Sequence, residues 1–263
     1  MSIFVLWAFA ASICTWALTA LGAAIVVFFK APKPNVLNLL LGFSAGVMIA
    51  ASFWSLLQPA IERANSSLNV PAYIVVTIGF VFGAVFIWIS DTAVLKTVFS
   101  SESNNNFKVN RVIMLIISIT LHNIPEGLVV GVAFGLLKND FTMSSLMGAL
   151  SIAIGIGLQN FPEGAAVSLP LRREGYSRKK SFFYGQLSAI VEPFAAVIGA
   201  ILVTKIESFL PFALSFAAGT MIIVAVHELI PECQQNKAEQ PYMATMGIIL
   251  GFSVMMFLDV MLG

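Results

Sequence analysis

Two apolar segments of the chain contain the same six-residue frame, and each frame carries a carboxylate. The frames read His122-Asn123-Ile124-Pro125-Glu126-Gly127 and Gln159-Asn160-Phe161-Pro162-Glu163-Gly164. A charged carboxylate near the centre of a bilayer costs roughly 2.5 to 3.5 kcal/mol or more, so such groups mark functional sites. Two carboxylates in matching frames therefore predict a cation site inside the membrane.

The spacing within each frame gathers polar side chains beside the glutamate. The first residue of the frame precedes the glutamate by four positions and the second precedes it by three, so both lie on neighbouring strips of one helix face. This geometry predicts two adjacent ion sites that share Glu126 and Glu163 as bridges. The frame proline cannot donate a backbone hydrogen bond, which predicts a kink and a freed carbonyl. Gly127 and Gly164 leave room for a neighbouring helix to approach closely.

A third carboxylate, Glu192, lies in a later apolar segment, directly before a proline. No Lys or Arg lies at a comparable depth in these three segments, so protons or a cation must neutralise the glutamates. His122 favours a zinc-like transition metal over Na⁺ or Ca²⁺, because imidazole suits zinc, iron, cobalt, nickel and copper. The first site is expected to comprise His122, Glu126, Gln159 and Glu163, whose two negative charges balance one divalent ion.

Helices that cross a membrane must hold these residues. Hydrophobic residues make up 59% of the 263 positions and charged residues 10%, and apolar runs of about 20 residues recur along the chain. The runs and their breakers predict eight helices, near residues 3–29, 36–61, 72–90, 110–137, 144–171, 180–203, 210–232 and 242–262. We expect a single polytopic transmembrane domain, residues 1–263, with a flexible cytoplasmic loop at about 91–110.

The basic residues predict the orientation of these helices. Eleven of the fourteen Lys and Arg residues lie in the loops after helices one, three, five and seven. Because positive loops stay in the cytoplasm, both termini are expected outside it. Basic residues confined to loops, with a net charge of +1, give no indication of a nucleic-acid partner.

A second histidine lies near the expected cytoplasmic end of helix seven, where His227 precedes Glu228. Two interpretations of this pair stay open. It is either a metal stop on an exit path or an interfacial polar cluster.

An internal repeat indicates the architecture. The segment Phe43-Ser44-Ala45-Gly46-Val47-Met48-Ile49 recurs as Phe216-Ala217-Ala218-Gly219-Thr220-Met221-Ile222, and four residues of helix three recur in helix eight with the same spacing. Helices one to three therefore reappear as six to eight, and the five-span displacement inverts the second copy. The expected fold is an all-α membrane protein of eight transmembrane helices, with an inverted repeat of helices 1–3 and 6–8 around a central pair of helices 4 and 5. Such repeats are typical of transporters with a site near the midplane.

The rival function is that of an intramembrane metallohydrolase, in which His and Glu ligands hold a catalytic zinc with an open position for water. Such a site needs a further histidine or a His-Glu-x-x-His frame. The chain has two histidines, on different predicted helices, and no such frame. We therefore expect a transporter rather than an enzyme.

The paired frames, residues 44–53 of helix two and the His-Glu-Leu-Ile-Pro-Glu run at 227–232 resemble the ZIP metal transporters, particularly the GufA-type bacterial branch, over nearly the whole chain. The resemblance implies uptake of divalent metal, chiefly Zn²⁺ with Cd²⁺, Fe²⁺, Mn²⁺ or Co²⁺ as variants, across the plasma (inner) membrane. It also implies a homodimer in the lipid bilayer, in which helices one, four, five and six slide against helices two, three, seven and eight. It assigns a transport site to His122, Glu126, Gln159 and Glu163, and a neighbouring metal site to Asn123, Asn160 and Glu192.

The chain departs from the family pattern at three points. Many members carry histidine where Gln159 stands, and some relatives carry aspartate where Asn160 stands. With Asn160, the two sites share three carboxylates, which is too little charge to balance two divalent ions. The loop after helix three lacks the histidines with which many relatives capture metal on the cytoplasmic side.

Overall fold

The computed structural model describes residues 2–28, 34–99, 107–139, 141–203, 209–234 and 242–262. Within these ranges it contains eight helical segments long and apolar enough to cross a membrane, as predicted. Three of the eight spans consist of more than one helical element. The elements are α1 (Ile3–Phe28), α2 (Pro34–Ala51), η1 (Ser52–Leu57), α3 (Gln58–Ser67), α4 (Ala72–Phe99), α5 (Phe107–Leu136), α6 (Met143–Arg173), α7 (Arg178–Leu187), α8 (Val191–Val203), α9 (Leu210–Val224), η3 (Ala225–Leu229), α10 (Ile230–Cys233) and α11 (Met243–Leu262).

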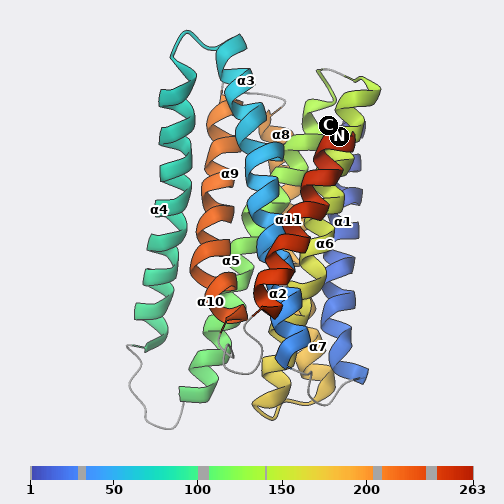
Figure 1. Cartoon of the computed structure of the whole chain (residues 1–263), viewed down its shortest axis with the longest axis vertical. Coiled ribbons are helices and arrows are strands. Elements are labelled where there is room, and N and C mark those ends of the chain that lie inside the picture. Colours follow the sequence, from blue (N-terminus) through green and yellow to red (C-terminus); the bar gives the residue numbers. More distant parts are fainter. Residues whose placement is uncertain are drawn as a thin grey trace.

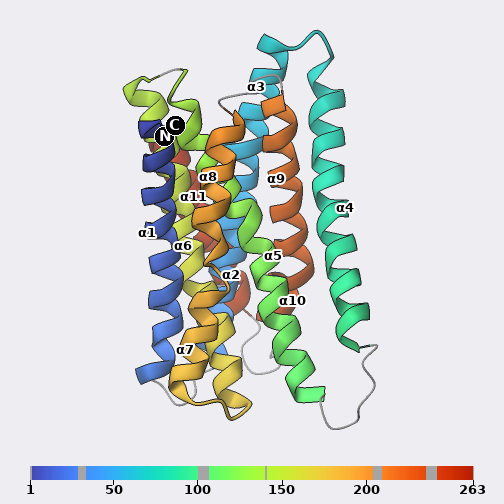
Figure 2. The same ribbon diagram turned by 180° about the vertical axis from the view of Figure 1, so that it is seen from behind.

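The helices run side by side along the long axis of the molecule (Figure 1). In Figures 1 and 2, α4 lies at one edge of the bundle and α1 near the opposite edge. Both chain ends lie at the same end of the bundle, as an even number of spans requires.

The packing of the helices confirms the inverted repeat. The most extensive contacts pair α2 with α11, α4 with α9, α1 with α6, and α5 with α8. The repeat relates span one to six, two to seven, three to eight and four to five. Under this exchange the α2–α11 contact becomes the α4–α9 contact, and the α1–α6 contact becomes the α5–α8 contact. The duplicated sequences therefore build duplicated interfaces.

Glycines at matching repeat positions make two of these interfaces. A Cβ added at Gly46 of α2 would collide with the backbone carbonyl of Ile248 in α11, and one at Gly219 of α9 would collide with that of Phe80 in α4. Ile248 and Phe80 are themselves repeat equivalents. Small residues let the backbones of membrane helices approach closely. In lipid there is no hydrophobic effect between helices, so this van der Waals contact drives their association.

The π-helical elements η1 and η3 also begin at equivalent positions of the repeat. At the end of η1, the N–H of Gln58 donates to the carbonyl of Phe53, and at the end of η3 the N–H of Ile230 donates to that of Ala225. The next residue in each case is a proline. Since a proline ring excludes the carbonyl four residues earlier, each helix widens to a five-residue hydrogen-bond step just before it.

Two sequence-based boundaries were wrong. The loop expected at about 91–110 is shorter, because α4 continues to Phe99 and α5 begins at Phe107. Backbone hydrogen bonds carry a helix past the end of its apolar stretch, so hydropathy alone underestimates its length. The remaining residues of that loop, 100–106, lie outside the described residues. The sixth span is not the continuous helix expected over 180–203, because it divides into α7 and α8 at residues 188–190.

Candidate metal site

The three predicted carboxylates lie on α5, α6 and α8, and α5 packs against both of the other helices. Glu126 and Glu192 have no exposed surface, and Glu163 is 6% exposed. Hydrogen bonds link Glu126 to Gln159 and Glu192 to Asn160, and these two amide side chains are sequence neighbours on α6. Asn123, Gln159 and Asn160 are fully buried on the same helices. The structure therefore brings together six of the seven residues predicted for the two adjacent sites.

The seventh predicted ligand is His122. Its backbone belongs to α5, one turn before Glu126, but its side chain lies outside the described residues. Its role as a ligand stays a prediction.

A hydrogen bond joins the two frames directly. Nε2 of Gln159 in α6 donates to Oε1 of Glu126 in α5. The other oxygens of both groups, Oε2 of Glu126 and Oε1 of Gln159, are buried without a hydrogen-bond partner in the described part of the chain. No donor among the described residues satisfies these two acceptors, and such acceptors suit a cation.

Glu163 is held from a different part of the bundle. The hydroxyl of Ser44 in α2 donates to Oε1 of Glu163 at 3.0 Å and lies 3.4 Å from the backbone carbonyl of Gln159. Ser44 is fully buried. A single serine therefore connects the second carboxylate to the first repeat.

Glu192 is held by three donor contacts. Nδ2 of Asn160 lies 2.8 Å and 3.0 Å from its two carboxylate oxygens, and Oγ1 of Thr15 in α1 donates to Oε2 at 2.6 Å. A carboxylate that receives charge-assisted bonds at both oxygens is firmly positioned. Both oxygens of Glu192 thus have donors, whereas Oε2 of Glu126 has none in the described ranges.

The break between α7 and α8 lies directly beside this carboxylate. Pro193 has no N–H to donate to Ala189, and the N–H of Glu192 donates to that carbonyl instead, at 3.0 Å. The carbonyl of Ser188 then accepts a 3.2 Å hydrogen bond from Nδ2 of Asn123 in α5. Backbone groups freed at membrane depth must find partners inside the protein, and Asn123 provides one.

The frame glycines make the close helix contacts expected of them. A Cβ added at Gly127 would collide with the backbone of Glu192, and one at Gly164 would collide with the backbone of Thr19. Both α5 and α6 continue as helices through their frame prolines. The kinks expected there stay a prediction.

The second predicted pair, His227 and Glu228, lies in η3, which packs against α2 and α9. His227 is exposed and Glu228 is half-buried. Both interpretations of the pair, an exit-path metal stop and an interfacial polar cluster, stay open.

Across the described ranges, no three His, Cys, Asp or Glu side chains form a group that could hold a metal by themselves. A site on these helices must therefore include amide oxygens or the side chain of His122. The donor set predicted from the sequence contains both.

Sequence reasoning missed two side chains of the site, Thr15 and Ser44. A signal for the first was present, since Ser12, Thr15 and Thr19 recur at helical spacing in an otherwise apolar segment and are all buried. Such a polar strip faces protein rather than lipid. The sequence indicates Ser44 more weakly. It is polar where its repeat equivalent, Ala217, is apolar.

A polar cavity of about 520 Å³ lies at the end of the bundle that holds the chain termini. Asp259 lines it and accepts hydrogen bonds from Ser55 at 2.8 Å and Ser151 at 3.1 Å. The full lining comprises Trp54, Ser55, Gln58, Pro59, Glu62, Gly148, Ile152, Asp259 and Val260.

Comparison with known proteins decides the family. The profile described as the ZIP zinc transporter family matches residues 100–259, which contain both frames and Glu192. The chain is also 37% identical to the human protein named zinc transporter ZIP11, over 95% of each chain. The chain belongs to the ZIP zinc transporter family.

Bacterial members of the ZIP family are similar over most of their length. The chain is 33% identical to zinc transporter GufA of Myxococcus xanthus, over 96% of this chain and 98% of that one. It is also 33% identical to zinc transporter ZIPB of Bordetella bronchiseptica, over 94% of this chain and 79% of that one. These proteins confirm the predicted resemblance, including its GufA-type branch. They are named transporters rather than enzymes, so the metallohydrolase alternative gains no support.

Proposed function

We propose that this ZIP family member imports zinc-like divalent cations into the cytoplasm through the site built by its two frames. The observation that carries the proposal is a set of buried acceptor oxygens that have no donor among the residues the structure describes. They are Oδ1 of Asn123, Oε2 of Glu126, Oε1 of Gln159 and Oδ1 of Asn160. Nearly all buried polar atoms in proteins have partners, and a cation satisfies several acceptors at once.

The primary ligands in this proposal are His122, Glu126, Gln159 and Glu163. Two carboxylates balance one divalent charge, and an imidazole ligand favours a transition metal over a hard ion. Zinc is the main cargo, in line with the names of the similar proteins, and Cd²⁺, Fe²⁺, Mn²⁺ and Co²⁺ are variants that the same donors accept.

The neighbouring group of Asn123, Asn160 and Glu192 takes a supporting part. A second ion at Glu192 must first displace the Asn160 amide, which contacts both carboxylate oxygens. We therefore assign one ion to the primary ligands, and a second ion to this group only when Asn160 turns its amide oxygen toward it.

The mechanism proposed is alternating access by sliding of two helix groups. The ligand bundle (α1, α5, α6, α7 and α8) carries every candidate ligand of the two sites. The flanking bundle (α2, η1, α3, α4, α9, η3, α10 and α11) contacts the site through Ser44. A transport step that moves the ligand bundle carries the ion with its ligands intact and, at the site itself, exchanges the serine contact.

In this proposal the protein lies in the plasma (inner) membrane as a homodimer, with both termini outside the cytoplasm. The polar cavity at the terminal end is then the outer approach to the site. Its carboxylates, Asp259 and Glu62, favour the arrival of cations.

Uptake of radiolabelled zinc by cells that produce the protein tests this function. Glu163→Ala is expected to reduce uptake to the level of cells without the protein, because it removes one of two charges that balance the ion. Glu174→Ala, in the turn after α6, is the matched control. Wild-type uptake by Glu163→Ala at equal surface expression would show that the site is assigned wrongly.

A further inference from the structure

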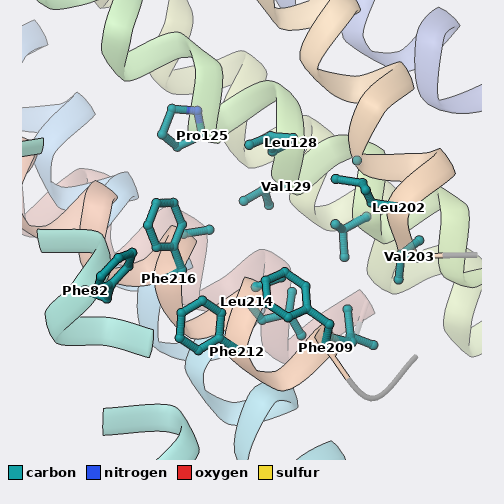
Figure 3. Close-up of a pocket in the computed structure, with 15 residues that line it drawn as sticks. Phe82, Pro125, Leu128, Val129, Leu202, Val203, Phe209, Phe212, Leu214 and Phe216 are labelled. Carbon is teal, nitrogen blue, oxygen red and sulfur yellow. The ribbon is translucent and has the colours of Figure 1, made fainter. Parts of the chain in front are cut away.

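A groove of about 310 Å³ lies between two pairs of packed helices, α4–α9 on one side and α5–α8 on the other (Figure 3). All fifteen lining residues are apolar. They are Phe82, Pro125, Leu128, Val129, Val132, Gly199, Leu202, Val203, Phe209, Leu210, Phe212, Ala213, Leu214, Phe216 and Ala217. None of the candidate metal ligands lines this groove.

The two walls of the groove differ in character. Phe82, Phe212 and Phe216 form an aromatic wall, with the ring of Phe82 6.2 Å from each of the other two. The opposite wall is aliphatic and comes from α5 and α8, as the labelled side chains in Figure 3 show. No lining side chain offers a hydrogen bond, so a polar ligand would lose its own hydrogen bonds on binding. The groove therefore suits a hydrocarbon.

The surroundings of the groove indicate where the hydrocarbon comes from. Apart from Phe209, every lining residue lies inside one of the candidate membrane spans. The rim is open, since Phe82 is 58% exposed and Leu202 45%, whereas Val129 and Leu214 at the base are 3% and 5% exposed. At this depth the solvent of the protein is lipid acyl chains.

We propose that one acyl chain of a membrane phospholipid binds in this groove, between the ligand bundle and the flanking bundle. The groove reaches Pro125, the residue directly before the candidate ligand Glu126. The acyl chain thus packs against the turn of α5 that bears the ligand and against α9 of the other bundle. This lipid binding does not depend on the proposed transport function.

Photolabelling tests the binding. The wild-type protein is placed in nanodiscs that contain a phospholipid with a diazirine in its acyl chain, irradiated without metal, and mapped by peptide mass spectrometry. Labels are expected to concentrate on the groove walls, residues 125–132 and 209–217, above the level at Phe194, which is 66% exposed and lies outside the groove lining. In Ala213→Phe, the added ring occupies the groove, and labelling there is expected to fall about tenfold.

Matched variants guard against a folding defect. Ala10→Phe adds the same ring to an exposed position of α1 outside the groove, and it should leave groove labelling unchanged. Ala213→Leu is a smaller insertion and should give an intermediate loss. Labelling of the groove no higher than that of Phe194, or unaffected by Ala213→Phe, would overturn the proposal.

Discussion

At the scale of single residues, the two frame carboxylates are held by different means. Glu126 is held by an amide of the other frame, and Glu163 by the hydroxyl of Ser44 on the flanking bundle. Glu126 therefore keeps its partner when the two bundles slide, whereas Glu163 exchanges one. The hydrogen bonding of Glu163 is thus expected to change with the position of the ligand bundle.

Asn160→Asp is expected to raise the number of zinc ions bound per chain from about one to about two. The change removes the Nδ2 donor that contacts both oxygens of Glu192 and adds the fourth carboxylate that two divalent ions require. Equilibrium dialysis of the purified protein with zinc measures the ratio. A wild-type protein that already binds two ions per chain would contradict the supporting part given to Asn160.

Glu192→Gln is expected to change the affinity or the order of metals more than it abolishes uptake. Its carboxamide oxygen can still accept from Thr15, but its amide group faces the donor of Asn160, so the packing around the primary ligands shifts. Uptake of zinc, cadmium and manganese at several concentrations measures the effect. An unchanged order and unchanged concentrations for half-maximal uptake would remove Glu192 from the site.

Much of the site could be predicted from residue types and spacing, because buried charge is costly and so rare that it marks function. The two frames and Glu192 follow from that argument. Thr15 and Ser44 do not, since a lone hydroxyl in an apolar helix can bond to its own backbone at little cost. Their contacts with Glu192 and Glu163 depend on which helices pack together.

At the scale of the helical elements, close backbone contacts hold the ligand bundle together. Gly127 and Gly164 occupy equivalent positions of the paired frames, and each lets its helix approach a neighbour, at Glu192 and at Thr19 respectively. The same contact therefore occurs twice, once with a carboxylate and once with a hydroxyl.

Gly164→Val is expected to destabilise the folded protein by about 1–3 kcal/mol, because its side chain must push α6 away from α1. Gly148→Val is the matched control on the same helix, since a Cβ there meets nothing within 4 Å. Thermal unfolding in detergent measures both variants. Equal midpoints for the two variants would contradict the close contact between α1 and α6.

The number of spans and the inverted repeat could be predicted at this scale, because hydropathy and repeated glycines are local features of the sequence. The π-helical elements and the α7–α8 break could not. A proline predicts only that one hydrogen bond is lost. Whether the helix widens, kinks or stops depends on which donors form hydrogen bonds to the freed carbonyls. One of them, the carbonyl of Ser188, accepts a hydrogen bond from Nδ2 of Asn123 on a different helix.

At the scale of the whole molecule, the division into two bundles separates binding from anchoring. The candidate ligands lie on the ligand bundle, whereas the interfaces α2–α11 and α4–α9 join the helices of the flanking bundle to one another. The acyl-chain groove and the Ser44 contact both lie where the bundles meet. Motion between the bundles would change these two features first.

The orientation of the whole molecule is expected to place residue 2 outside and residue 179 in the cytoplasm. Ser2→Cys and Lys179→Cys, each in a background with Cys14→Ala and Cys233→Ala, report on opposite ends of the bundle. A membrane-impermeant thiol reagent on intact cells should label the first and spare the second. Labelling of the second alone would reverse the topology and, with it, the direction proposed for transport.

The most direct measurement is zinc influx into proteoliposomes that contain purified protein and an internal zinc indicator. The wild type should give influx, with the order among zinc, cadmium and manganese reporting selectivity. Glu126→Gln and Glu163→Gln keep the side-chain shape but remove one charge each, and their influx should fall by roughly 100-fold or more. Glu174→Gln, outside the site, should match the wild type. Influx that survives in both site variants, or no influx of any metal with the wild type, would contradict a transporter that works through these two glutamates.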